Sequence, residues 1–434
     1  MLTDAQGLAV TTDALEVTDV IDQFTDQLLS YGDRPSIIFE GLMIDPTHVL
    51  LNAHAAAMCL FSETATAPAL AAPYLQAAHA NLHTATEREQ LYVHAIDAWA
   101  TGQIDRALVY HRELAERYPR DLVAAFIGQY HHFYAGDNHG LLALIEQIFP
   151  ANRDNHYAYG MLSFALEQCH RLDEAETMGC QAVEMNRHDP WAHHAVAHVL
   201  ETQGRIEDGI AWMESFADVW ETCGTFFTHN WWHVALYYLD QDDFTTVLNL
   251  YDTNVWGRAV KEYSACQIDA IALLLRLELR GVDVGDRWQT IGAYLGDRIH
   301  EHVFPFNDVH YIYALARSSH AELADTMLHS MQTHAATTHS FRQKTWMDVA
   351  VPTAHGMVAH ARGDWSSAVA YLGTALPQMQ AIGGSHAQRD LFEQVYLDAL
   401  IQAHEATLAN HVIEKRMIRR KIPALQRQLA MIAR

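Results

Sequence analysis

The sequence is poor in cysteine, which argues against a disulfide framework and against a cysteine-based zinc site. Five cysteines occur among 434 residues, an odd number with no Cys-x-x-Cys pair. They stand far apart in the chain, at Cys59, Cys169, Cys180, Cys223 and Cys266. We therefore expect reduced thiols that lie mostly in the core.

Basic residues and long apolar runs are also scarce. The chain has 28 Lys and Arg against 53 Asp and Glu, a formal net charge of −25, which disfavours nucleic-acid binding by counterion release. No run of eighteen apolar residues occurs, and the N-terminal segment lacks the basic and apolar regions of a signal peptide. With 50% hydrophobic residues the chain is globular. We expect a soluble, cytoplasmic protein without a nucleic-acid or membrane partner.

Alternating Val, Ile and Thr runs typical of strands are almost absent, and helical periodicity dominates, so the fold class is all-α. A short phrase recurs along the chain as GQIDRA (102–107), HRLDEA (170–175) and GRIEDG (204–209), and more loosely as GDWSSA (363–368). Ile104 and Leu172 are 68 positions apart, and Leu172 and Ile206 are 34 apart. The missing middle copy falls at GDNHGL (136–141). A 34-residue helix pair is the tetratricopeptide signature.

The sequence thus predicts a single continuous tetratricopeptide-like α-α superhelix, a solenoid with a concave face. First helices are expected near 88–100, 122–134, 156–168, 190–202 and 228–239, with looser units near 305–318 and 349–361. Residues 1–86 should form capping or extending helices, residues 87–253 the regular repeats, and residues 254–434 divergent repeats with an irregular C-terminal helical region. Within the last part, 254–296 breaks the period.

The last helices are locally basic, which has two interpretations. The basic residues Lys415, Arg416, Arg419, Arg420, Lys421, Arg427 and Arg434 stand against one acid, Glu414. The first interpretation is a solvated helix face that balances an acidic body. The second is contact with another copy of the chain in a homodimer.

The chemistry-bearing side chains concentrate between Trp191 and His233. In the 34-residue register Trp191, His194, His198 and Glu201 are spaced three, four and three apart, so they share one stripe of a helix that faces the concave groove. His193 falls at a packing position. In the next unit His229 and Trp232 face the same groove, with His233 adjoining them. FNDVH (306–310) parallels HNWWH (229–233), which pairs Asn307 with Asn230 and His310 with His233.

Three interpretations of this cluster compete. A zinc site could use His194 and His198 with Glu201 or His229, although Ala195 stands where an HExxH motif would place its glutamate. In a metal-free site, His194 and His198 act as acid, base or ligand-binding groups, and the charge of Glu201 raises the pKa of a ring, beside walls formed by Trp191 and Trp232. The third interpretation is structural packing of satisfied polar groups.

A weaker candidate is GGSHAQRDLF (383–392). Ser385 is expected to cap a helix, with Arg389 and Asp390 forming a surface pair. In the functional alternative, Arg389 reaches into the groove to bind a carboxylate or a phosphate.

Six motifs in a fixed order carry a family resemblance. They are HAVAH-x-x-E (194–201), HN-aromatic-WH (229–233), YDT (251–253), GV-x-VG-x-RWQ (281–289), FND-x-H (306–310) and GGS-x-AQRD (383–390). The chain resembles the tetratricopeptide repeat protein 38 family from about Glu87 to about Phe392. The resemblance implies a soluble helical-repeat protein and no particular reaction. The family's polar motif positions correspond here to His194, His198, Glu201, His229, Asn230, His233, Asn307, Asp308, His310, Arg389 and Asp390. His386 departs from the expected Asn.

The sequence therefore favours a pocket on the concave face that binds a small polar molecule and performs acid/base chemistry of the hydrolase or lyase type. The expected catalytic residues are His194, His198, Glu201, His229 and His233. The expected ligand-binding residues are Trp191, Asn230, Trp232, Asn307, Asp308, His310, Arg389 and Asp390. No cofactor is expected, with zinc on His194, His198, Glu201 and His229 as the weaker alternative. The alternative function is a peptide- or protein-binding scaffold without catalysis.

Overall fold

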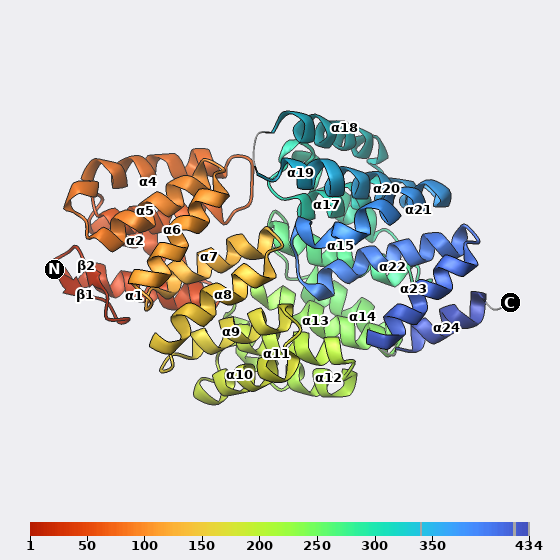
Figure 1. Cartoon of the computed structure of the whole chain (residues 1–434), viewed down its shortest axis with the longest axis horizontal. Helices are drawn as coiled ribbons and strands as arrows, with labels where there is room; N and C mark the ends of the chain where they lie inside the picture. The colour runs from red at the N-terminus through yellow and green to blue at the C-terminus, as the bar shows by residue number, and fades with distance from the viewer. Residues whose placement is uncertain (339–340, 420–421, 433–434) are drawn as a thin grey trace. The chain divides into compact units, whose positions relative to one another are not determined.

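The computed structural model describes residues 1–338, 341–419 and 422–432, and the regular secondary structure of these residues is almost entirely helical. The predicted fold class, all-α with tetratricopeptide-like helix pairs, is confirmed (Figure 1). By internal contacts the chain divides into two compact units. Unit 1 comprises Met1–Phe133, Asp137–Val196 and Val219–Gly224, and unit 2 comprises Tyr134–Gly136, Ala197–Asp218 and Thr225–Arg434. The three-part division of the repeats at residues 86 and 253 stays a prediction.

Unit 1 opens with a two-stranded antiparallel pair and continues in helices. Its elements are β1 (Leu2–Thr3), β2 (Ala9–Val10), α1 (Leu15–Leu29), α2 (Ile37–Ile44), α3 (Val49–Leu60), α4 (Ala67–Asn81), η1 (Leu82–Thr84), α5 (Glu87–Ala100), α6 (Ile104–Arg117), α7 (Leu122–Tyr134), α8 (Asn138–Ile148), η2 (Phe149–Ala151), α9 (His156–Gln168) and α10 (Leu172–Met185). Helix α11 (Pro190–Gln203) begins in unit 1 and ends in unit 2, and η3 (Ala217–Thr222) belongs mostly to unit 1.

Unit 2 holds the remaining helices. They are α12 (Ile206–Glu214), α13 (Phe226–Asp240), α14 (Phe244–Leu250), the π-turn η4 (Tyr251–Val255), α15 (Ser264–Glu278), α16 (Arg287–Gly292), η5 (Gly296–His300), α17 (Pro305–Arg317), α18 (Ala321–Thr337), α19 (Gln343–Thr345), the π-turn η6 (Trp346–Ala350), α20 (Val351–Ala361), α21 (Trp365–Ala375), η7 (Leu376–Ile382), α22 (His386–Gln402), α23 (Ala406–Arg419) and α24 (Pro423–Ile432).

The 34-residue register holds along the regular repeats. Helices α7, α9 and α11 begin at residues 122, 156 and 190, and α6, α8, α10 and α12 begin at residues 104, 138, 172 and 206. The unit inferred at GDNHGL is therefore α7 with α8. The looser units predicted near 305 and 349 correspond to α17 and α20.

The turn inside each pair explains the recurring phrase. Gly102, Gly136 and Gly204 have φ of 73°, 69° and 71°, in the left-handed region that glycine adopts at low cost. His170 takes the same position with φ of 58°. The residue two positions later starts the second helix, and it is aliphatic in three of these four pairs and Asn138 in the fourth. The phrase therefore records one turn geometry.

Polar residues at helix starts also recur in unit 1. Asp121, Asn155 and Asp189 lie 34 residues apart, and their side chains accept hydrogen bonds from backbone N–H groups in the first turns of α7, α9 and α11. Asp121 also lies 2.8 Å from Arg88, and Asp189 lies 2.8 Å from His156, each one repeat earlier. Neighbouring repeats are thereby joined through the cap.

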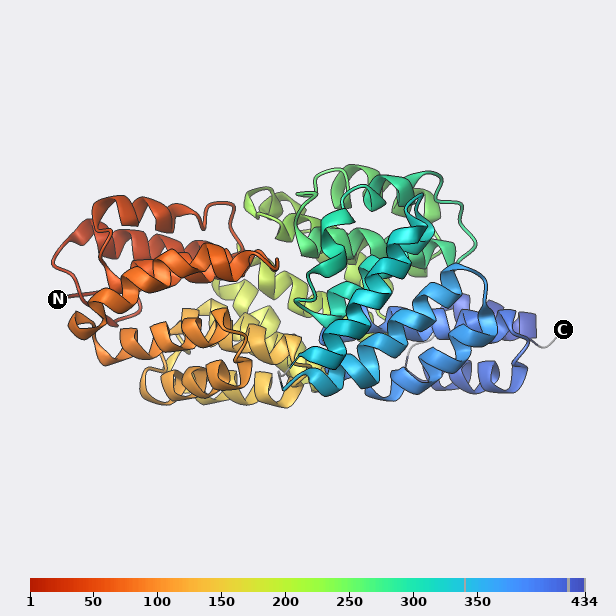
Figure 2. The ribbon, with the colours of Figure 1, turned by 90° about the horizontal axis from the view of Figure 1, so that it is seen from above.

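Apolar contacts of α3 organise the N-terminal helices of unit 1. Its alanine-rich sequence lets α4 and α5 approach closely (Figure 2). Phe24, Leu50, Tyr92 and Ile127 are buried in the resulting core. Residues 1–86 of the sequence were predicted as helices, and β1, β2 and the short α2 are additions to that pattern.

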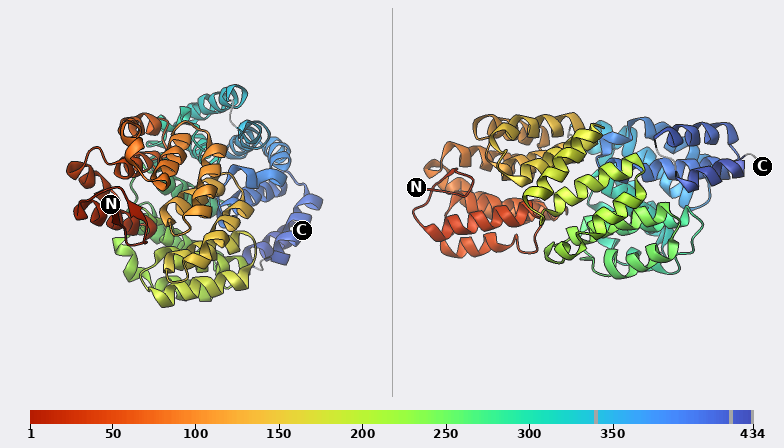
Figure 3. Two further views of the ribbon diagram at one scale, coloured as in Figure 1. Left: turned by 60° about the vertical axis from the view of Figure 1, so that its left-hand side comes forward. Right: turned by 90° about the horizontal axis from the view of Figure 1, so that it is seen from below.

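In unit 2 consecutive helices pack on one another toward the C-terminus, where α22 packs on α23 and α23 on α24 (Figure 3). Arg416 of the basic tail is buried there between carboxylates of α22, 2.7 Å from Asp390 and 2.8 Å from Glu393. Arg427 pairs with Asp242 in the same unit. Arg416 therefore does not belong to a solvated face, whereas the Arg427 side chain is 53% exposed and does. Arg420, Lys421 and Arg434 lie outside the described residues.

Across residues 1–338, 341–419 and 422–432, no helix combines the length and the apolar character needed to cross a membrane.

Candidate functional site

Helix α13 buries most of the HNWWH motif in unit 2. Asn230, Trp232 and His233 are each 0% exposed, and the side chain of His229 is 16% exposed. The His229 ring stacks on Trp232 with centroids 5.4 Å apart and meets the His233 ring edge-on at 5.0 Å. Successive turns of one helix therefore bring two imidazoles and an indole together.

The C-terminal half of α11 supplies the other side of this cluster. The rings of His198 and His233 are 4.5 Å apart, and Oε2 of Glu201 lies 3.6 Å from Nδ1 of His233. His198 and Glu201 are buried as well. We call His198, Glu201, His229 and His233 the histidine cluster. The predicted stripe on α11 and the predicted face of α13 meet here.

Burial decides the protonation of the cluster. Burial, with the neighbouring charge of His233, holds the pKa of His198 well below its ordinary value, although Glu201 acts in the opposite direction. Burial and the charge of His229 likewise lower the pKa of His233. Glu201 has the predicted effect on His198, since its charge raises the pKa of that ring, but desolvation outweighs the carboxylate and the net shift is downward. Both imidazoles are neutral at pH 7.

Two charged residues of α15 complete the surroundings, and sequence reasoning missed both. Oδ2 of Asp269 lies 2.9 Å from Nδ1 of His229. The Arg276 guanidinium lies 5.4 Å from the Trp232 ring and donates to the carbonyl oxygens of Ala272 and Ala387. Burial lowers the pKa of Arg276 to about 10, which leaves it cationic. The available signal was a carboxylate and a guanidinium seven residues apart in the apolar run IDAIALLLR.

Asn230 is the unusual member of the motif. Both its amide oxygen and its amide nitrogen are buried, with no hydrogen-bond partner in the described part of the chain. A buried amide without partners costs about 1–3 kcal/mol of folding stability. Such a group indicates that a bound molecule supplies the missing hydrogen bonds.

The predicted residues on the first half of α11 pack among aromatic rings of unit 1. Trp191 stacks on Tyr31 at 5.2 Å, and His194 lies 5.6 Å from the Phe164 ring and 4.8 Å from the Trp191 ring, centroid to centroid. His193 lies 2.9 Å from the carbonyl oxygen of Arg187 and accepts a hydrogen bond from Trp220, which agrees with the packing role expected for it. His194 precedes His198 by four residues on α11.

The FNDVH motif on α17 sends its polar groups to different partners. His310 lies against the Phe392 ring, and its Nδ1 donates to the carbonyl oxygen of Phe306 at 2.7 Å. Asp308 accepts instead from Nδ1 of His302 at 2.6 Å. Asn307 is buried. The parallel with HNWWH is therefore one of sequence spacing, and Asp308 serves a separate group of residues.

Ser385 caps α22 as expected, through a reciprocal pair of hydrogen bonds with Gln388. Arg389 donates to the carbonyl oxygens of Gly383 and Gly384. Asp390 does not form the expected pair with Arg389, because Arg416 of α23 takes that role. Burial raises the pKa of Asp390, but Arg416 outweighs it and brings the pKa to about 2.

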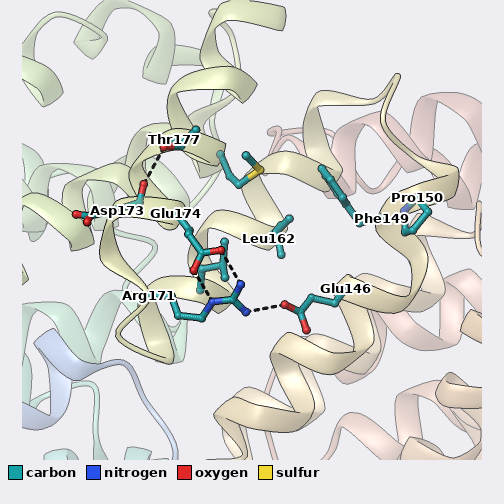
Figure 4. Close-up of a pocket in the computed structure, with 10 residues that line it drawn as sticks. Glu146, Phe149, Pro150, Leu162, Arg171, Asp173, Glu174 and Thr177 are labelled. Atoms are coloured by element: carbon teal, nitrogen blue, oxygen red, sulfur yellow. Dashed lines mark hydrogen bonds and ion pairs between the residues drawn. The ribbon is translucent and has the colours of Figure 1, made fainter.

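A surface pocket of about 420 Å³ lies in unit 1 between α8, η2, α9 and α10 (Figure 4). Phe149, Leu162 and Met178 give it an apolar lining. At its rim Arg171 bridges Glu146 and Glu174, at 2.7 and 2.6 Å. None of the predicted site residues lines this pocket.

No protein-family model matches the chain. Among solved structures, the chain is similar to the Rap protein complexed with competence and sporulation factor, with 12% identity, a TM-score of 0.44, and coverage of 74% of this chain and 98% of that chain. It is also similar to the human IFIT1 dimer with m7Gppp-AAAA, with 11% identity, a TM-score of 0.42, and coverage of 99% and 94%. For the TPR domain of P58(IPK) the values are 9% identity, a TM-score of 0.21, and coverage of 74% and 99%.

Proposed function

We propose that the histidine cluster of unit 2 binds a small polar molecule and performs acid/base chemistry of the hydrolase or lyase type on a tetratricopeptide-like scaffold. The observation that carries this is the buried contact of His198 and His233 at 4.5 Å, with Glu201 3.6 Å from His233. A neutral imidazole can take up a proton, and a nearby carboxylate stabilises the cation that forms.

The surrounding residues support ligand binding. The Asn230 amide can donate and accept in the same buried region of α13. Arg276 contributes a cation that favours an anionic or carbonyl-containing ligand. We further propose membership in the tetratricopeptide repeat protein 38 family, since its polar motif positions include this cluster.

The test uses the purified full-length chain incubated with a small-molecule cell extract, with substrate loss followed by mass spectrometry. His198→Gln and His233→Gln are compared with wild type. The matched control is His54→Gln, which alters a fully buried histidine of unit 1 that hydrogen-bonds to Tyr92. We expect depletion of at least one compound by wild type and His54→Gln and a loss of 100-fold or more in the cluster variants. Equal depletion by all four proteins, or by none, would refute the proposal.

Metal analysis of the same preparations distinguishes a zinc site from metal-free acid/base chemistry. Stoichiometric zinc that disappears in His198→Gln and His233→Gln, but stays in His54→Gln, would make the cluster a metal site. Zinc at trace level in wild type would exclude the zinc site and favour the metal-free acid/base chemistry.

Peptide binding in unit 1 is the second candidate function, favoured by the pocket between α8 and α10. Its apolar lining and the excess of Glu146, Asp173 and Glu174 over Arg171 suit a peptide with apolar and basic side chains. Met178→Glu should abolish binding of such peptides in fluorescence anisotropy and leave turnover by the histidine cluster unchanged.

A further inference from the structure

A second group of catalytic residue types lies in unit 2, apart from the histidine cluster. It joins the loop after η5, the first turn of α17 and the middle of α18. Oδ2 of Asp308 lies 2.6 Å from Nδ1 of His302, and Nε2 of the same ring lies 2.7 Å from Oγ of Ser330. Asp308 and His302 are buried, and Ser330 is partly exposed.

The two hydrogen bonds fix the tautomer of His302. The carboxylate accepts the proton carried by Nδ1, so Nε2 is left as an acceptor for the hydroxyl of Ser330. A carboxylate that orients an imidazole, which in turn accepts from a hydroxyl, is the arrangement that activates a serine nucleophile. In such a triad the imidazole must contact the carboxylate through one nitrogen and the hydroxyl through the other. Both contacts of His302 are within normal hydrogen-bond distance.

The neighbours hold this geometry in place. The Trp346 ring meets His302 edge-on at 5.9 Å and His334 at 4.7 Å, so the imidazole is confined on an apolar side. The backbone of His302 has φ of 47°, a strained conformation for a non-glycine residue that its two side-chain hydrogen bonds help to maintain. Nδ1 of the exposed His300 lies 2.8 Å from Oγ of Ser330 on the solvent side.

We propose that Ser330, His302 and Asp308 form a nucleophilic triad that cleaves activated carboxylic esters. The hydroxyl proton of Ser330 passes to Nε2 of His302 while Oγ bonds to the ester carbonyl carbon. The C–O bond to the alcohol then breaks, and the alcohol leaves with the proton from His302. Water attacks the acyl-Ser330, its proton returns through His302 to Oγ, and the carboxylic acid departs.

The position of Ser330 sets the substrate class. It lies in the interior of α18, where the backbone N–H groups are used in helical hydrogen bonds and cannot form an oxyanion hole. Because the Ser330 hydroxyl donates to His302, Nδ1 of His300 donates to Oγ and not to the carbonyl oxygen, where the negative charge develops. Esters with a good leaving group, such as aryl esters, need the least further stabilisation, whereas amides need the most.

The test treats the purified full-length chain with an alkyl fluorophosphonate and follows the adduct by intact-mass and peptide mass spectrometry. Attack by Oγ on phosphorus releases fluoride, and the hydroxyl proton leaves through His302. We expect one adduct per chain on Ser330, and an initial burst of 4-nitrophenol from 4-nitrophenyl acetate. Ser330→Ala should remove both, and alanine in a helix interior preserves the fold.

Two further variants separate catalysis from structural support. His302→Gln keeps a polar side chain of similar length and should slow labelling by 100-fold or more. Asp308→Asn should also slow it by 100-fold or more, since it disturbs the tautomer. Ser366→Ala, at an exposed helical serine of α21, is the control and should label at the wild-type rate.

Absence of an adduct on Ser330 in the folded wild-type chain would overturn the triad. So would labelling of Ser330 at an unchanged rate in His302→Gln. The two sites share no residue, so His233→Gln should label normally at Ser330, and failure of one proposal is distinguishable from failure of the other.

Discussion

Nδ1 of His310 lies 2.7 Å from the carbonyl oxygen of Phe306, one turn earlier in α17. This hydrogen bond places the ring proton on Nδ1 and leaves Nε2 buried, with no hydrogen-bond partner among the described residues. Burial, with the charge of Arg276, lowers the pKa of His310 to about 4.

Acid should therefore destabilise unit 2 through His310. The ordinary pKa of 6.5 applies in the unfolded state, so the unfolded chain binds the proton first as the pH falls. The stability held by neutral His310 is present above pH 6.5 and is lost as the pH drops toward 4, by on the order of 3 kcal/mol from a shift of about 2.5 units. Urea unfolding at pH 7.5, 5.5 and 4.5 measures the loss.

His310→Gln cannot take up the proton and should flatten this part of the acid dependence. The control is His329→Gln, at an exposed histidine of α18, which should keep the wild-type slope. An unchanged slope in His310→Gln would refute the assignment.

Arg416→Met should destabilise the last helices of unit 2 by about 2 kcal/mol, because Asp390 and Glu393 lose the cation buried between them. The pKa of Asp390 should rise from about 2, so the loss of stability that this carboxylate causes in wild type as the pH falls below 3.8 should shrink in the variant. Thermal and urea unfolding measure both effects. Arg427→Met is the control: its exposed pair with Asp242 is worth less than about 1 kcal/mol. Equal losses in the two variants would contradict the prediction.

The left-handed turn predicts that one substitution raises the free energy of unfolding and another lowers it. His170 has φ of 58°, which costs a non-glycine residue about 1–2 kcal/mol, so His170→Gly should raise the free energy of unfolding by about 1 kcal/mol. Gly102 has φ of 73°, and a Cβ there would meet no atom within 4 Å. Gly102→Ala should lower the free energy of unfolding by about 1 kcal/mol through the backbone alone. The same sign for both substitutions in chemical denaturation would count against this reading of the turn.

The helix pairs could be predicted from sequence because one local turn repeats. A residue in the left-handed conformation, followed two positions later by an aliphatic residue with an acid after it, marks three of the pairs, and His170 replaces only the glycine. The pair at GDNHGL keeps the glycine and the spacing of 34 residues. The contact between His198 and His233 could also be predicted from the sequence, since each histidine falls at a defined position of its own 34-residue unit.

Other features depend on contacts that no local pattern records. Asp269 and Arg276 lie in an apolar run, where the sequence indicates only a buried helix. His302 and Ser330 are 28 positions apart on separate elements, and neither belongs to a repeated phrase. The pKa of His198 could not be inferred from Glu201 alone, because the depth of burial decides its direction.

The capping residues of unit 1 affect the order in which its repeats unfold. Arg88 contacts the cap of α7, and His156 contacts the cap of α11, so each helix start is held by the repeat before it. Loss of one repeat releases the first turn of the next. Amide hydrogen exchange in unit 1 should accordingly advance repeat by repeat from an end, with backbone protection lost in the order of the chain.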